Sequence, residues 1–106
     1  MGIEELAEAV NKRKPELVAD LRLYTTEEGG RQGPVPPGWG CPTMTSPEGP
    51  GWDAWPQLGD EWLQLGETRR VGFVFLSPEG AETMRTAGKF YLWEGGIKGE
   101  AIVVPT

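Results

Sequence analysis

The sequence predicts a mainly β domain, a small barrel or a sandwich, with a short helix at its N-terminus and another inserted between strands. Sixteen glycines and ten prolines among 106 residues indicate frequent turns, which a fold of short strands requires. Five tryptophans, three phenylalanines and two tyrosines supply apolar area that disordered segments lack. A chain of this length buries one modest core, so a single domain is expected.

Residues 3–12 are predicted to form an amphipathic helix. Apolar residues recur at positions i, i+3, i+4 and i+7 of one helical face: Ile3, Leu6, Ala7 and Val10. Pro15 is expected either to end this helix or to restart a single turn over residues 16–19. A helix of about ten residues is only marginally stable alone in water. Its apolar face is therefore expected to dock on the domain or on a partner, which includes pairing with a second chain.

Period-two alternation and turn residues predict the strands. The predicted strands cover residues 21–25, 68–76, 89–93 and 100–104. Turns are expected at residues 27–31 and 94–96, where paired glycines allow positive φ. The order Ser77-Pro78 followed by Gly88 predicts a helix over residues 78–87.

Residues 33–60 are rich in proline, glycine and tryptophan. Their seven prolines are expected to exclude both a continuous helix and a central strand. We expect a long irregular loop with one edge strand near residues 42–45. Long ordered loops in compact domains are frequently functional, so this segment is the first candidate for a binding surface.

The tryptophans have two interpretations. Trp39, Trp52 and Trp55 could form an exposed aromatic platform, because tryptophan is enriched in binding hot spots. They could equally fold inward, as large aromatic side chains usually do. Trp62 and Trp93 are expected in the core.

The residues needed for ordinary catalysis are missing from the sequence. The chain contains no histidine, which removes the commonest general base and the Ser-His and Cys-His nucleophile pairs. Cys41 is the only cysteine, so it can form no intrachain disulfide, and it is expected to be buried and inert. Neither Gly88-Lys89 nor Gly95-Gly96 has the spacing of a phosphate-binding glycine motif. We therefore expect no enzymatic activity, no metal site and no cofactor.

Four carboxylates lie in or beside the tryptophan-rich loop: Glu48, Asp53, Asp60 and Glu61. Two carboxylates beside stacking aromatics are what a glycosidase or a sugar-binding cleft needs. In an acidic domain such residues are more often solvated surface groups. A carbohydrate or small-ligand site is therefore an alternative function.

The charge balance bears on partners and location. Sixteen acidic residues against ten basic ones give a net charge of −6, which argues against nucleic-acid binding. The run Lys12-Arg13-Lys14 fits a solvated helix end, where cations suit the helix dipole. The N-terminus lacks the features of a signal peptide, and no apolar stretch is long enough to span a membrane. A cytoplasmic location is expected.

Five short motifs in order resemble the third, C-terminal β-barrel domain of elongation factor Tu. The motifs are Glu28-Gly29-Gly30-Arg31, Gly38-Trp39 with Pro42, Leu65-Gly66-Glu67 before a strand, Gly88 to Gly96, and Lys98 to Val104. The likeness covers residues 19–104 and implies a small antiparallel β-barrel without enzymatic activity. Residues 1–18 would then be a helical extension, and residues 19–106 the barrel domain.

The resemblance also implies a function in binding. In that family the domain packs against the GTPase domain, the exchange factor and tRNA, and the Glu-Gly-Gly-Arg loop lies on the GTPase side. The closing hairpin departs from the pattern, because Ile97 stands where the family has an arginine on its tRNA-facing surface. Translation-related RNA binding is therefore only a second alternative.

Together these observations predict a non-catalytic module that binds an unidentified protein. The predicted contact residues come from the 28–31 turn and the tryptophan-rich loop: Glu28, Gly29, Gly30, Arg31, Trp39, Trp52, Asp53 and Trp55.

Overall fold

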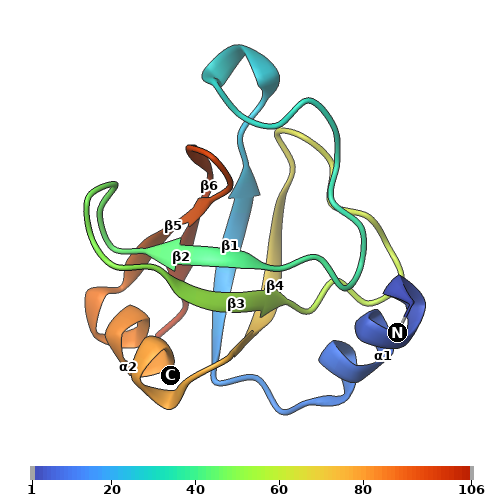
Figure 1. Cartoon of the computed structure of the whole chain (residues 1–106), viewed down its shortest axis with the longest axis horizontal. Coiled ribbons are helices and arrows are strands. Elements are labelled where there is room, and N and C mark those ends of the chain that lie inside the picture. The colour runs from blue at the N-terminus through green and yellow to red at the C-terminus, as the bar shows by residue number, and fades with distance from the viewer. Residues whose placement is uncertain (1, 106) are drawn as a thin grey trace.

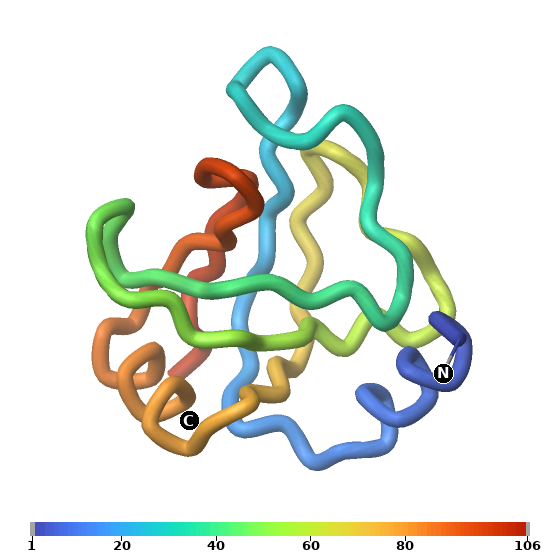
Figure 2. Tube along the Cα trace, in the orientation of Figure 1, coloured from blue at the N-terminus to red at the C-terminus, as the bar shows by residue number. Residues whose placement is uncertain are grey.

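The computed structural model describes residues 2–105 and contains one closed β-barrel (Figures 1 and 2). The strands are β1 (Leu17–Leu23), β2 (Cys41–Met44), β3 (Trp52–Pro56), β4 (Thr68–Phe75), β5 (Lys89–Trp93) and β6 (Ile97–Val103). They pair in the order β1-β4-β3-β2-β5-β6, and β6 pairs with β1 to close the sheet. Every pair is antiparallel. The predicted mainly β fold, a small antiparallel barrel with two short helices, is confirmed.

The inward faces of the strands fill the barrel. Along β1 every second side chain is buried, from Leu17 to Leu23. Three phenylalanines meet inside, with the ring of Phe73 5.1 Å from that of Phe90 and 6.4 Å from that of Phe75. Such tilted and edge-on contacts suit the quadrupoles of the rings.

Strand β1 begins earlier than the sequence predicted. No turn forms over residues 16–19, because Leu17 and Ala19 already alternate inward and pair with Phe73 and Val71 of β4. The strand also ends at Leu23 rather than at residue 25. Thr25 instead caps a one-turn 3-10 helix, Thr26–Glu28.

The strand expected near residues 42–45 forms as β2, but the rest of the prediction for residues 33–60, an irregular loop without a central strand, is wrong. The segment contains β2 and β3, and both are strands of the closed sheet. Pro42 is tolerated because β5 pairs with β2 only from Thr43 onward, and Pro56 because β2 does not reach the end of β3. Each proline therefore lies where one side of its strand has no neighbouring strand.

The second half of the chain follows the predictions closely. Helix α2 (Pro78–Ala87) is capped by Ser77 at its start and by Gly88 in the left-handed conformation at its end. The side chains of Ala81 and Met84 face the barrel core. Strand β5 has the predicted bounds, whereas β6 begins earlier, at Ile97.

Helix α1 (Ile3–Lys12) forms as predicted and docks on its own domain. Its only buried residue is Val10, and the Gln57 side chain donates to the backbone oxygens of Val10 and Arg13, at 2.9 and 2.6 Å. Asn11 exchanges two hydrogen bonds with the backbone of Gly59. In Figure 1 the helix lies at the side of the barrel opposite α2.

Candidate functional site

The charged and glycine residues of the 28–31 turn stabilise the conformation of the turn itself. The Glu28 carboxylate accepts from Arg22, at 2.7 Å, and from the backbone N–H of Thr25, at 2.9 Å. The Thr25 bond, followed by the Arg22 bond, lowers the pKa of Glu28 below its ordinary value. Gly29 has φ 90°, and a Cβ on Gly30 would overlap the backbone of Tyr24. Both glycines are therefore required by the backbone.

The guanidinium group of Arg31 is occupied inside the molecule. Its Nε donates to Glu94 at 2.7 Å, and its Nη1 donates to the backbone oxygens of Gly33 and Pro34 at 2.9 and 2.7 Å. It also lies 5.7 Å from the ring centroid of Trp39. Burial by itself raises the pKa of Glu94, but the hydrogen bonds from Arg31 and Trp39 outweigh it and lower that pKa overall.

The three tryptophans of the loop serve packing to different degrees. Trp39 is 9% exposed, belongs to the core and donates its indole N–H to Glu94 at 3.2 Å. Trp52 is half-buried against the core. Trp55 is half-buried and covers Gly40, where a Cβ would overlap its indole ring. Asp53 is exposed on β3, opposite Pro42 of β2.

Trp62 is not in the core as predicted; its relative exposure is 51%. The next residue, Leu63, fills the interior instead and forms a bridge with Val35 through two backbone hydrogen bonds of 3.0 Å. Neighbouring side chains of an extended segment point to opposite sides, so Trp62 points outward. Trp93, the other tryptophan expected in the core, is half-buried on β5.

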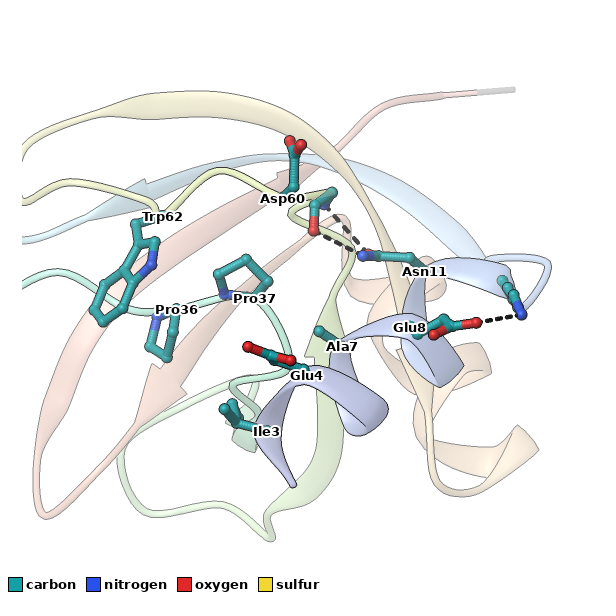
Figure 3. Close-up of a pocket in the computed structure, with 11 residues that line it drawn as sticks. Ile3, Glu4, Ala7, Glu8, Asn11, Pro36, Pro37, Asp60 and Trp62 are labelled. Atoms are coloured by element: carbon teal, nitrogen blue, oxygen red, sulfur yellow. Dashed lines mark hydrogen bonds and ion pairs between the residues drawn. The ribbon is translucent and has the colours of Figure 1, made fainter. Parts of the chain in front are cut away.

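Trp62 lines a groove between α1 and two loops (Figure 3). The groove has a volume of about 660 Å³. Its apolar side chains are Ile3, Ala7, Pro36, Pro37 and Trp62. Figure 3 shows Trp62 and the two prolines on one side and the first turns of α1 on the other. We call this feature the α1 groove.

The rim of the α1 groove is acidic. Its charged lining residues are Glu4, Glu8, Asp60 and Lys12. Lys12 forms an ion pair with Glu8 at 2.6 Å, so the one cation of the lining is already matched. Within residues 2–105, Glu4 and Asp60 take part in no ion pair. The rim therefore carries an excess of negative charge.

The four carboxylates considered for a sugar site do not converge. Glu48 lies in the turn that joins β2 to β3, whereas Asp60 and Glu61 follow the other end of β3. Among residues 2–105, no group of three or more His, Cys, Asp or Glu residues is arranged to hold a metal ion. Burial raises the pKa of the Cys41 thiol to about 12, so this cysteine is a poor nucleophile at neutral pH.

Comparison with known proteins adds no identification. No protein-family model matches the chain, and no curated protein matches it significantly. The resemblance to elongation factor Tu stays a prediction. In the part of the chain that the structure describes, neither helix is long and apolar enough to cross a membrane.

Sequence reasoning missed the α1 groove. The structure brings together residues of the N-terminal helix, of the 36–37 segment and of the 59–62 loop, which are far apart in the chain. One signal was present in the sequence: Leu63 and Leu65 alternate with Gln64, so Trp62 falls on the polar side of the same segment.

Proposed function

We propose that this chain is a non-catalytic module that binds another protein through the α1 groove. The observation that carries the proposal is the shared location of two exposed apolar side chains. Among residues 2–105 the exposed large hydrophobic side chains are Ile3, Trp62, Leu76 and Ile102. Two of them, Ile3 at 52% and Trp62 at 51%, line this one groove. Exposed aromatic anchors beside apolar clefts are typical of protein interfaces.

The α1 groove is better suited to binding a partner than the contact residues predicted from the sequence. The side chains of Glu28 and Arg31 form their hydrogen bonds within the turn and with neighbouring segments of the same chain. Trp39 is buried, so its side chain could contact a partner only by leaving the core, which would open the core. Trp52, Asp53 and Trp55 lie on β3, and they retain at most a minor contact role in this proposal.

The absence of a catalytic role is part of the proposal. The chain has no histidine to act as a general base. Its single thiol has a raised pKa and is buried, 8% exposed. None of the lining residues is a serine, threonine, cysteine or histidine, and we assign the groove carboxylates the role of attracting a partner electrostatically.

Site-specific photocrosslinking tests the proposal. A photoreactive phenylalanine analogue replaces Trp62 in one protein and Leu76 in a control, since Leu76 is 69% exposed and outside the groove. In lysate of the source cells, we expect position 62 to capture a defined protein that position 76 does not capture. Equal capture patterns at the two positions, or none at position 62, would contradict the proposal.

A carbohydrate ligand is the second candidate, because an exposed indole and Asp60 line the same groove. Sugar rings stack on such a surface, and a carboxylate accepts their hydroxyl hydrogen bonds. A glycan array would give a positive signal that Trp62→Ala abolishes. Uniformly negative arrays would remove this candidate.

The relationship to the third domain of elongation factor Tu also remains a proposal. The closed barrel of six strands agrees with the small antiparallel barrel that the resemblance implied. Architecture alone does not carry function, so the RNA-binding alternative gains no support from it.

A further inference from the structure

We infer that the α1 groove binds an extended, positively charged segment of its partner, with a lysine or arginine side chain seated over the indole of Trp62. The inference rests on the proposed function and specifies the chemistry of the occupant. Three features carry it: the charge of the rim, the unmatched aromatic ring and the size of the groove.

The charge of the rim selects a cationic occupant. Glu4 and Asp60 line the groove without ion pairs within residues 2–105, and Lys12 is matched by Glu8. Glu61, directly before Trp62, is exposed as well. An acidic segment would meet like charges here, whereas a basic one would be attracted and correctly oriented.

Three aromatic rings of this protein lie below a basic side chain, and the exposed ring of Trp62 is among the rings that do not. Arg22 lies over Tyr24 at 5.5 Å, Arg31 over Trp39 at 5.7 Å and Lys89 over Tyr91 at 5.3 Å. No described arginine or lysine occupies the corresponding position at Trp62. Tryptophan is the strongest cation–π acceptor among the side chains, so its exposed face is well suited to a basic side chain.

The size and lining of the groove fit a short peptide segment. A volume of about 660 Å³ is in the range of sites that hold drug-sized ligands. Pro36, Pro37 and Ala7 provide apolar contacts beside the ring. The occupant should therefore alternate basic side chains with apolar ones.

A second copy of this chain is the wrong partner on electrostatic grounds. The chain has a net charge of −6, so two copies repel each other over distances comparable to the Debye length. The acidic rim would oppose docking of another acidic surface.

Defined peptides test the inference. The probe is a 12-residue peptide of alternating lysine and leucine, and its counterpart has glutamate for every lysine. Calorimetry measures the dissociation constant of each in low salt, and NMR follows the indole N–H of Trp62. We expect the lysine peptide alone to bind, to shift that signal, and to bind at least tenfold more weakly at high salt.

Matched variants separate the groove from general attraction to an acidic protein. Glu4→Gln with Asp60→Asn removes two rim charges, and Glu27→Gln with Glu79→Gln removes two exposed charges outside the groove lining. We expect a loss of affinity of about threefold or more only for the rim pair. Trp62→Leu keeps an apolar side chain but removes the ring, and we expect a loss of about threefold.

Each failure has a distinct meaning. Equal affinity losses for the two charge pairs, or binding of the glutamate peptide, would overturn the inference. If photocrosslinking at position 62 captures a protein through a segment without lysine or arginine, the cationic inference fails while the proposed function stands. If position 62 captures nothing, the proposed function itself fails.

Discussion

Arg31 shows how a single side chain connects segments that are distant in sequence. Its guanidinium group reaches the carboxylate of Glu94 in the β5–β6 hairpin and two backbone oxygens of the segment before β2. Trp39 contributes its ring below the guanidinium and its indole N–H to the same carboxylate. Arg31, a charged turn residue that was predicted to contact a partner, therefore stabilises the fold instead.

Removing the negative charge of Glu94 should reduce stability in a pH-dependent manner. Because the folded-state pKa of Glu94 is lowered, its stabilising contribution is complete above the unfolded pKa of about 4.3 and is lost as the pH falls through the folded pKa. We expect Glu94→Gln to lower the free energy of unfolding by about 1 kcal/mol at pH 7, a modest value because the side chain is 43% exposed.

Urea unfolding at pH 7 and pH 3 measures this effect. The difference between wild type and Glu94→Gln should shrink at the lower pH, where the wild-type carboxyl is increasingly protonated. Glu27→Gln serves as the control, since Glu27 is exposed and forms no ion pair among the described residues. An equal deficit at both pH values would argue against the ion pair as its cause.

At the scale of elements, α1 depends on a few polar contacts with the barrel. Only Val10 of the helix is buried, and Gln57 binds the carbonyl groups at its C-terminal end. Gly72 of β4 makes room for this arrangement, because a Cβ there would overlap the Gln57 side chain. Since α1 forms one wall of the α1 groove, these contacts also maintain the candidate binding site.

Gln57→Ala should loosen α1 without disrupting the barrel. The change removes the side-chain donor from the backbone oxygens of Val10 and Arg13, of which Val10 still accepts from the backbone N–H of Arg13 at 3.3 Å, so we expect a cost of about 1 kcal/mol. Amide hydrogen exchange should accelerate in α1 more than in β4. Gln64→Ala is the matched control, because Gln64 is exposed and its side chain has no hydrogen bond within residues 2–105. Equal acceleration in both variants would contradict this role of Gln57.

For the whole molecule, closure of the sheet is the dominant feature. With β6 paired to β1, every strand has two neighbours, and no strand is an edge strand along its whole length. Closure removes the exposed edges that promote aggregation. It also makes the interior a single shared core, in which Phe73, Phe75 and Phe90 come from two different strands.

Truncation of one interior ring should therefore affect the entire barrel. Phe90 is fully buried, and its ring lies 5.1 Å from that of Phe73. We expect Phe90→Ala to lower the free energy of unfolding by about 3–5 kcal/mol, a large share of the stability of a small domain. Leu76→Ala, at a side chain 69% exposed, should cost less than about 0.5 kcal/mol. A loss below about 1 kcal/mol for Phe90→Ala in urea unfolding would contradict a single shared core.

Local pattern was sufficient for much of the fold. The apolar face at i, i+3, i+4 and i+7 predicted α1, the Ser77 and Gly88 caps predicted α2, and strict alternation predicted β4 and β5 with nearly correct ends. These signals are properties of neighbouring residues, so the sequence by itself determined the class of fold and most of its elements.

The tertiary structure decided which distant segments pair with one another and which side chains they cover. Strands β2 and β3 form in a proline-rich segment because β4 and β5 supply pairing partners on their other sides. Trp62 is exposed because Leu63 bridges to Val35, and it borders a groove because α1 docks nearby. Local periodicity says which side chains are apolar, but whether an apolar side chain is covered depends on residues far along the chain. The candidate site consists of contacts between residues that lie far apart in the chain.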